Sequence, residues 1–366
     1  MSDSTYFAST LYTWFATHGR KLPWRNAPSP YQVWVSELML QQTQVATVIP
    51  YYERWMTRFP TLESLANAEL DEVLKLWSGL GYYRRARYLH EGSRVILSQF
   101  GGQFPQTIAK LRKIPGIGAY TAGAVASFAF GQNEPAIDGN VDRVLSRFFG
   151  ITLDLSTHEG RQIIEERAHE IAHWGHANIV NQAIMDLGAS CCSRIAHCAS
   201  CPLFTQCEAR RLGLTESLPL KKRKCERYRE YRAAIRLISP DNRILLAKRR
   251  ADQLLGGLWE YPMITLLRAK MQNEDSPNAL RMPRESTWKN WLSAHGQNAN
   301  IARLVMGKNE ITHIFTHIQM HVVTDEATYL GETTPSWDGD EIYDRFEWVK
   351  DIHTGYALSS LMKKLG

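Results

Sequence analysis

Residues 111–143 read LRKIPGIGAYTAGAVASFAFGQNEPAIDGNVDR, and this stretch decides the fold of the first half of the chain. Gly116 and Gly118 lie two residues apart, where glycine lets the backbone turn tightly and approach another backbone. The pattern predicts a helix of small residues over 119–130, whose N-terminal amides and dipole favour an anion such as a DNA phosphate. A hairpin packed in a core without a ligand is the alternative, and the Gly-x-Gly spacing alone favours it.

The composition indicates a soluble globular protein of two or three domains. Of the 366 residues, 44% are hydrophobic and 22% charged, which is enough apolar material for a sizeable core. The net charge of +6 and a pI near 8.9 favour a polyanionic partner only mildly. No apolar run in the sequence is long enough to span a bilayer, and the N-terminal residues MSDSTYFAST lack the features of a secretory signal. We therefore expect a cytoplasmic protein.

Helical periodicity dominates the first half of the chain, and strand patterns dominate the second. Helices are predicted over residues 5–18, 31–42, 44–58, 119–130, 158–173 and 178–189, with two short ones within 61–100. After the basic stretch LPLKKRKCERYREYR, we predict a hairpin of 232–239 with 243–249, a helix over 286–295, strands over 311–323 and 346–349, and a helix over 357–365. The two halves therefore belong to different fold classes, mostly α and then α+β.

All six cysteines fall between Cys191 and Cys225. A secreted disulfide protein would spread them along the chain, so this clustering indicates a metal or cluster site in a reducing compartment. Four thiolates in a tight loop bind zinc or an iron–sulfur cluster, and thiolate softness does not choose between them. A zinc ribbon would have two separated C-x2-C pairs. Only Cys198 and Cys201 form such a pair, which favours a [4Fe–4S] cluster.

Two carboxylates and one turn are candidate functional features, and each also has a purely structural interpretation. Glu37 lies among aliphatic and tryptophan neighbours, so its carboxyl is either turned to water or kept near its neutral form by desolvation. Asp138 starts a helix and is at least an N-cap. The sequence GLGYYRR at 79–85 could wedge into a base stack and hold phosphates, or could be a tyrosine-capped turn with solvated arginines.

From about residue 22 onward the chain resembles the MutY-type adenine DNA glycosylases. The matching motifs occur in the family's order: LPWR at 22–25, SELMLQQTQV at 36–45, GLGYYRRAR at 79–87, IPGIGAYTAGA at 114–124, DGNVDRV at 138–144, MDLGA at 185–189 and the four-cysteine loop. Endonuclease III-like relatives share the helix-hairpin-helix and the cluster loop. SELMLQQTQV and the second domain narrow the match to MutY.

The resemblance implies a helix-hairpin-helix glycosylase domain over residues 1–215, with an iron–sulfur loop at 191–207. It implies a basic interdomain linker over 216–228 and a Nudix-like 8-oxoguanine recognition domain over 229–366. A monomer acting on double-stranded DNA with an adenine:8-oxoguanine or adenine:guanine mispair is expected. The glutamate-rich motif of Nudix hydrolases does not follow WEYPMITLL, so we expect no pyrophosphatase activity.

The family's chemistry assigns roles to the residues already singled out. Adenine is flipped out of the duplex, and Glu37 protonates N7 of the departing base. Asp138 stabilises the oxocarbenium-like sugar, either through its charge or through a transient covalent bond, while Tyr120 and Asn140 position the groups. Lyase-competent relatives carry lysine at position 120 and form a Schiff base there. A phenol cannot form an imine, so we predict base removal without strand cleavage.

The resemblance also implies residues that contact the DNA and the damaged base and residues that bind the cluster. The DNA and base contacts implied are Arg25, Gln42, Tyr82, Gly116, Gly118, Gln182, Asp186, Phe315, Thr316 and His317. Of these, Tyr82 wedges beside the oxidised guanine, and Gln182 and Asp186 hydrogen-bond the adenine edge. The chain has Phe-Thr-His where the family commonly has Phe-Ser-His, which retains a hydroxyl. The implied cluster ligands are Cys192, Cys198, Cys201 and Cys207.

The first cluster ligand has an alternative. Cys192 lies at the family's usual distance from MDLGA, but its spacing to Cys198 is one residue shorter than is usual in the family. Cys191 has the usual spacing to Cys198 but lies one residue too close to MDLGA. We favour Cys192, because a helix end fixes position better than a loop does. Two other functions also stay open from the sequence: an endonuclease III-like glycosylase/lyase, and a non-enzymatic metal-bearing DNA-binding module in which Glu37 and Asp138 are spare carboxylates.

Overall fold

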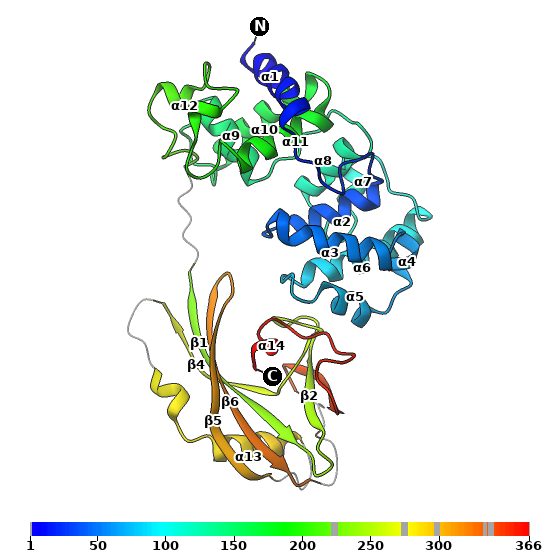
Figure 1. The fold of residues 1–366 in the computed structure, drawn as a ribbon, viewed down its shortest axis with the longest axis vertical. Coiled ribbons are helices and arrows are strands. Elements are labelled where there is room, and N and C mark those ends of the chain that lie inside the picture. Colours follow the sequence, from blue (N-terminus) through cyan, green and yellow to red (C-terminus); the bar gives the residue numbers. More distant parts are fainter. Residues whose placement is uncertain are drawn as a thin grey trace. The chain divides into compact units, whose positions relative to one another are not determined.

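The computed structural model describes residues 2–220, 226–271, 277–295, 301–331, 335 and 340–365. The chain forms two compact units, one of residues 1–68 with 87–223 and the other of residues 69–86 with 224–366 (Figure 1). The second unit therefore takes a short helical segment from the first half of the sequence. The sequence-based boundaries at 215 and 229 stay a prediction, and part of the predicted linker, residues 221–225, lies outside the described residues.

Helices make up nearly all regular structure up to residue 211. They are α1 (Asp3–His18), α2 (Pro30–Leu40), α3 (Val45–Arg58), α4 (Leu62–Ala66), α5 (Leu70–Trp77), α6 (Arg84–Phe100), α7 (Ile108–Leu111), α8 (Ala119–Phe128), α9 (Gly139–Phe148), α10 (His158–His173), α11 (Ala177–Ala189), the 3-10 turn η1 (Cys198–Ser200) and α12 (Glu208–Arg211). The mostly helical character predicted for the first half is confirmed.

Local capping explains where several of these helices begin. Ser29 and Gln32 form a capping box at the start of α2, and Pro30 occupies its first position, where proline is favoured. The prediction of two short helices within 61–100 is wrong, because α4, α5 and α6 occupy this stretch and α6 is 17 residues long. Between α5 and α6 the backbone takes positive φ at Gly79, Gly81 and Tyr82, which no helix accommodates.

The second half is built on a seven-stranded sheet. Its elements are β1 (Tyr228–Ile238), β2 (Ile244–Arg249), β3 (Trp259–Glu260), β4 (Met263–Lys270), η2 (Pro277–Arg281), α13 (Glu285–His295), β5 (Ile301–Ile314), β6 (Ile318–Tyr329), β7 (Tyr343–Val349) and α14 (Met362–Leu365). The order is β3-β2-β1-β6-β5, with β4 also pairing with β1 and β7 with β2. Strands β1 and β6 are parallel, and the other pairs are antiparallel.

Two predictions for this half need correction. The strand expected over 311–323 is two strands, because β5 ends at Ile314 and β6 begins at Ile318. The backbone turns there, and the amide of Phe315 donates to the carbonyl of Ile318 at 2.7 Å. The helix expected over 357–365 is reduced to α14, a single turn.

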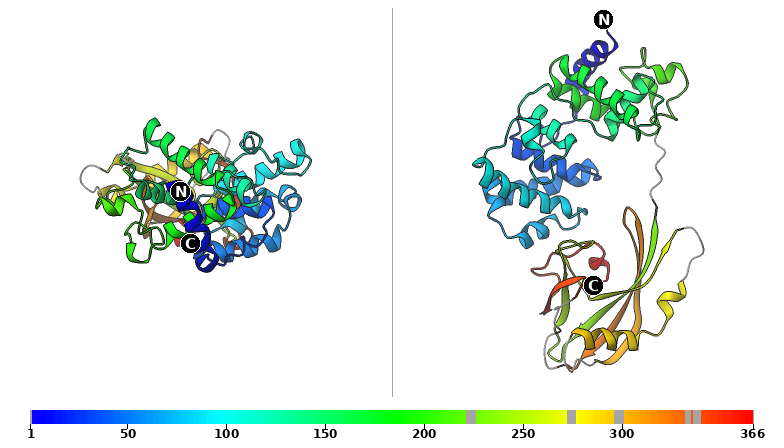
Figure 2. Two further views of the ribbon diagram at one scale, coloured as in Figure 1. Left: turned by 90° about the horizontal axis from the view of Figure 1, so that it is seen from above. Right: turned by 180° about the vertical axis from the view of Figure 1, so that it is seen from behind.

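Each unit has its own core. In the helical unit, α1, α9, α10 and α11 enclose apolar side chains such as Phe7, Leu145 and Leu187. In the second unit the sheet is covered on both faces, and α13 lies across one of them, as the views in Figure 1 and Figure 2 agree. Trp288 and Leu292 of α13 are fully buried there. None of the helices described is long and apolar enough to cross a membrane.

Candidate active site

A cavity of about 950 Å³ opens in the helical unit where α2, α8, α9 and α11 converge. This volume accommodates a nucleotide-sized ligand. Most of the predicted active-site residues line it: Arg25, Glu37, Gln42, Tyr120, Asp138, Asn140 and Gln182. Apolar side chains of Leu22, Trp24, Val33, Phe128 and Met185 complete the wall. The structure therefore brings together predicted site residues that are up to 157 positions apart in the sequence, from Arg25 to Gln182.

Glu37 is buried in this wall and is poised to exchange a proton. Only 5% of its surface is exposed, and the hydroxyl of Tyr120 donates a hydrogen bond to its Oε2. Desolvation raises the pKa of Glu37 to about 7, and the nearby charge of Asp138 adds to this rise. The hydrogen bond from Tyr120 and the charge of Arg25 act in the opposite direction. At neutral pH the carboxyl thus holds its proton in a large fraction of molecules, as a general acid must.

Asp138 is the N-cap of α9 and faces the same cavity. Its Oδ1 accepts from the amides of Asn140 and Val141, at 2.9 and 2.8 Å, and its Oδ2 accepts from Nδ2 of Asn140 at 2.7 Å. Burial raises the pKa of Asp138, while these hydrogen bonds and the position at a helix N-terminus favour the charged form. The capping role and the exposure to the cavity are therefore compatible.

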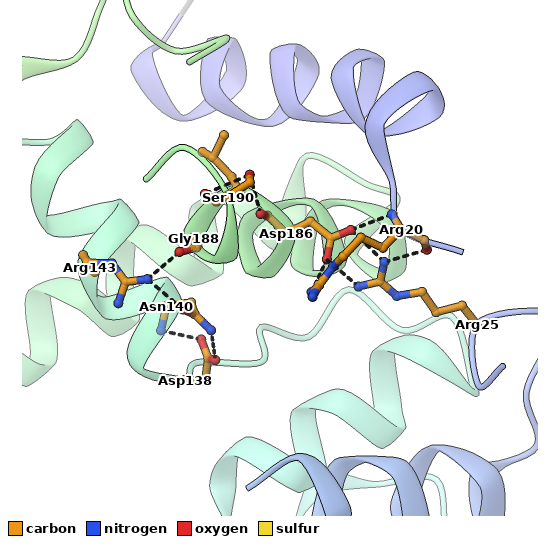
Figure 3. Close-up of polar contacts among 9 residues, drawn as sticks. Arg20, Arg25, Asp138, Asn140, Arg143, Asp186, Gly188 and Ser190 are labelled. Carbon is orange, nitrogen blue, oxygen red and sulfur yellow. Dashed lines mark hydrogen bonds and ion pairs between the residues drawn. The ribbon is translucent and has the colours of Figure 1, made fainter. Parts of the chain in front are cut away.

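Arg143 connects this cap to the end of α11 (Figure 3). Its Nη2 donates to Oδ1 of Asn140 at 2.8 Å and to the carbonyl of Gly188 at 2.7 Å, and its Nε donates to the carbonyl of Cys192 at 2.8 Å. A Cβ at Gly188 would lie 2.7 Å from Cβ of Asn140. Glycine at this position in MDLGA therefore lets Asn140 pack directly against α11.

Arg25 lines the cavity, but Asp186 does not have the position that the sequence analysis gives it (Figure 3). Asp186 lies outside the residues that line the cavity, and 2% of it is exposed. Both of its carboxylate oxygens accept hydrogen bonds from Arg20 and Arg25. The interpretation that Asp186 meets the adenine edge is therefore corrected, because two guanidinium groups already occupy its acceptors.

Comparisons with known proteins show which family the chain is similar to. The HhH-GPD superfamily of base excision DNA repair proteins matches residues 35–170, and the NUDIX domain matches residues 233–365. The adenine DNA glycosylase of Mus musculus is 36% identical over 372 residues, which cover 87% of this chain and 70% of the mouse protein. That of Homo sapiens is 33% identical and covers 100% of this chain and 74% of its own length.

The chain belongs to the adenine DNA glycosylases. A relative from Buchnera aphidicola subsp. Baizongia pistaciae is 33% identical over 86% of this chain and 84% of its own length. Among solved structures, a thermostable thymine-DNA glycosylase has a TM-score of 0.53 at 27% identity and covers 57% of this chain and 97% of its own. Endonuclease III in a trapped covalent complex with DNA, at a TM-score of 0.50 and 21% identity, shows the shared fold.

The turn of the helix-hairpin-helix in this adenine glycosylase is formed by residues 114–118, between α7 and α8. Gly116 has φ of +80°, and a Cβ there would lie 2.5 Å from Cβ of Tyr88, so only glycine fits this position. Gly118 is the N-cap of α8 and, having no side chain, leaves the first amides of the helix without a side-chain cap. The arrangement suits the predicted phosphate contact.

The cysteine loop of the glycosylase surrounds a second, small cavity. Cys191, Cys192, Cys198, Cys201 and Cys207 all line it, together with Arg147. Nη1 of Arg147 donates to Sγ of Cys192 at 3.6 Å and to the carbonyl of Ser193 at 2.6 Å. Within the described part of the chain, no three His, Cys, Asp or Glu side chains are arranged to hold a single metal ion. Thiols gathered around one cavity beside a cation are the donor type that ligates iron–sulfur clusters.

The predicted 8-oxoguanine contacts lie in the second unit of the glycosylase. Tyr82, with φ of +47° and 45% of its surface exposed, is in the segment that groups with the sheet. Its hydroxyl and Oγ1 of Thr316 are 3.0 Å apart and form a hydrogen bond. Phe315 and His317 flank this threonine in the turn between β5 and β6, where the ring of Phe315 packs against His313.

Two residues at the site, Arg20 and Arg143, were not predicted from the sequence. Arg20 lies in a loop without a motif and lines the cavity beside Arg25. Arg143 is within the quoted stretch DGNVDRV, but its partners Gly188 and Cys192 come from α11 and the cysteine loop, more than 40 residues away. The sequence signal that could have pointed to Arg20 was Asp186, an acidic residue in the otherwise apolar stretch MDLGA with no basic residue beside it.

Proposed function

We propose that this glycosylase excises adenine mispaired with 8-oxoguanine or guanine by acid-assisted hydrolysis and leaves an abasic site. Adenine excision in base excision repair is the activity of its family. The observation that carries the mechanism is that one cavity holds Glu37, with its pKa near 7, and Asp138, held by three donors that favour its charged form. Two carboxyl groups with different environments can divide acid and charge-stabilising work between them.

In the proposed reaction, Glu37 gives its proton to N7 of adenine as the N-glycosidic bond breaks. Adenine leaves poorly as an anion, so protonation lowers the barrier. The bond's electron pair goes to the base, and the sugar becomes oxocarbenium-like. Asp138 stabilises this positive charge, and Asn140 and the N-terminus of α9 hold its carboxylate. Water then adds to the sugar and releases a proton, which returns Glu37 to its acid form and completes the hydrolysis.

Tyr120 supports a reaction that ends at base removal. Burial raises its pKa well above the ordinary value, so the phenol stays protonated and donates to Glu37. No imine can form on a phenol oxygen, in contrast to a lysine at this place in the hairpin.

The first test is incubation of the protein with a duplex that carries adenine opposite 8-oxoguanine. We expect strand breaks only after alkali cleaves the abasic site, and no efficient covalent trapping by borohydride. A duplex with cytosine opposite 8-oxoguanine serves as the matched control and remains intact. Efficient trapping would contradict base removal without lyase chemistry, and an intact adenine strand after alkali would contradict the proposed substrate.

Recognition of 8-oxoguanine is supported by the pair of hydroxyl groups on Tyr82 and Thr316. The tyrosine ring is exposed at a glycine-flexed turn, a geometry suited to insertion beside a base. Thr316 holds the phenol by its hydroxyl, and the same oxygen has capacity for a further hydrogen bond. The hydrogen bond between Tyr82 and Thr316 therefore links the proposed wedge to the proposed recognition loop within the second unit.

Substitution Thr316→Val removes this hydroxyl with little change in shape. We expect the preference for adenine opposite 8-oxoguanine over adenine opposite guanine to fall about fivefold, because one net hydrogen bond contributes about 1 kcal/mol. The ratio of single-turnover rates on the two duplexes measures it. Thr312→Val, which removes the exposed hydroxyl bonded to His321, is the control and keeps the ratio. Equal rate losses on both duplexes with Thr316→Val would refute the assignment.

We also infer that the cysteine loop holds a [4Fe–4S] cluster through Cys192, Cys198, Cys201 and Cys207. The support is the common cavity that these thiols line and the cation of Arg147 beside them, which stabilises thiolates. When bound, the cluster would cross-link the loop of residues 191–207, which has little regular structure. Cys191 lines the same cavity, so geometry alone keeps it as a competitor for the first position.

Single serine substitutions distinguish the two neighbours. Cys192→Ser is expected to lose most of the visible absorbance of the purified protein and to lower its unfolding temperature. Cys191→Ser is expected to keep the absorbance. Iron content per chain provides a second readout that does not depend on activity. Loss of colour in Cys191→Ser alone would reverse the assignment.

A further inference from the structure

We propose that Asp186 is a positioning residue that holds Arg25 at the wall of the active-site cavity and balances its charge, with Arg20 as the second member of the cluster. The inference rests on the function proposed above, because it concerns the surroundings of Glu37 as the acid. Asp186, Arg20 and Arg25 are called the charge cluster below.

The charge cluster joins two distant parts of the helical unit (Figure 3). Asp186 is on the last turn of α11, whereas the arginines are in the loop between α1 and α2. Arg25 donates from Nη1 to Oδ2 at 2.7 Å and from Nη2 to Oδ1 at 2.8 Å. Arg20 donates from its amide to Oδ2 at 2.9 Å and from Nε to Oδ1 at 2.7 Å. Paired bonds of this kind set the orientation of a guanidinium as well as its position.

Further contacts keep Arg25 in this orientation. Its Nη1 also donates to the carbonyl of Arg20 at 3.1 Å, and its guanidinium lies 5.4 Å from the ring centre of Phe15. Arg25 lines the cavity, while Asp186 lies behind it. The carboxylate therefore acts on the reaction through the arginine and not by contact with a base.

The charge of Arg25 matters because Glu37 is close enough to respond to it. The charged or titratable groups facing Glu37 are Tyr120 from α8, Asp138 from the start of α9 and Arg25 from the loop before α2. Of these, the charge of Arg25 and the Tyr120 hydrogen bond lower the pKa of Glu37. An arginine without a counter-charge would lower that pKa further and take the proton away from the acid.

Asp186 is suited to supply that counter-charge at every working pH. Burial alone would raise its pKa, but the hydrogen bonds from Arg25 and Arg20 hold the pKa of Asp186 below its usual range. One carboxylate and two guanidinium groups leave the charge cluster with a net charge of +1. Asp186→Asn changes this charge to +2, Arg20→Gln changes it to 0, and the double variant restores +1.

The test is the pH dependence of single-turnover adenine excision for the four proteins. Activity requires protonated Glu37, so the wild-type rate falls as pH rises through the acid's pKa, near 7. With Asp186→Asn this fall in rate moves to lower pH by about one unit. At pH 8 the rate is then about tenfold lower than in the wild type, in addition to any loss that is the same at every pH. With Arg20→Gln it moves to higher pH. The double variant returns it to the wild-type position while the maximal rate stays low.

Each outcome decides the proposal. Opposite shifts for the single variants and a return in the double variant support it. A uniform loss of rate with an unmoved pH profile in all variants indicates a structural role only and overturns it. Should Asp186→Asn fail to fold, Arg20→Gln and the double variant still give the predicted difference in profile. Wild-type protein without adenine excision on either mispair would instead refute the proposed function.

Discussion

Glu37→Gln is expected to lower the rate of adenine excision by about 10³-fold at pH 7, while the protein still binds the mispaired duplex. The substitution keeps the size of the side chain and an acceptor for Tyr120, but it removes the proton that N7 of adenine must receive. General acids typically contribute about 10²–10⁴-fold. Single-turnover excision measures the rate, and a gel-shift or anisotropy titration measures binding.

The matched control is Glu53→Gln on α3, an exposed glutamate that lies outside the cavity. Its rate should equal that of the wild type. A Glu37→Gln protein with wild-type activity would exclude Glu37 as the acid.

Stability gives a second readout for Glu37. Because its pKa is raised from 4.5 to about 7 on folding, the buried carboxyl favours the folded state fully below pH 4.5. That contribution is lost as pH rises through 7. The difference in unfolding temperature between Glu37→Gln and the wild type should therefore shift in favour of the variant when the pH is raised from 5 to 9.

Asp138→Asn is expected to separate the two roles of this residue. Asparagine caps helices as well as aspartate does, so the unfolding temperature should change little. The rate should fall by about 10²–10³-fold, because the variant lacks the negative charge that stabilises the developing cation at the sugar. Thermal unfolding and single-turnover excision on the same preparations measure the two effects.

Thr157→Ala is the control for the cap. Thr157 caps α10 through a hydrogen bond from the amide of Gly160 at 3.1 Å, and it is not part of the cavity. Its loss should cost about 1 kcal/mol of stability without a change in the rate. An Asp138→Asn variant that unfolds as easily as Thr157→Ala and keeps its rate would show that Asp138 is a cap and nothing more.

The elements of the helical unit were largely predictable because their signals are local. The helices expected over 5–18 and 31–42 correspond to α1 and α2, which Gly19 and Ser29 cap, and Asp138 is the N-cap that its position indicates. The glycines of the hairpin and the resemblance together located the cavity residues Glu37, Tyr120 and Asn140. Each of these depends on residues within a few positions or on motifs in a fixed order.

What could not be predicted depends on contacts between distant segments. Asp186 was assigned to the adenine edge, because its partner Arg20 is 166 positions away and is marked by no motif. Residues 311–323 follow a strand pattern, yet the register of β5 with β6 requires a turn at 315–317. Tyr82 was placed correctly in a turn, but its bond to Thr316 joins residues 234 positions apart.

The charge cluster also has a consequence for the order in which the site forms during synthesis. Arg20, Arg25 and Glu37 leave the ribosome early, whereas Asp186 follows some 150 residues after Glu37. Until α11 has been made, both arginines lack the carboxylate that pairs them, and Asn140 lacks the surface beside Gly188. Glu37 therefore acquires these surroundings only when the helical unit is nearly finished.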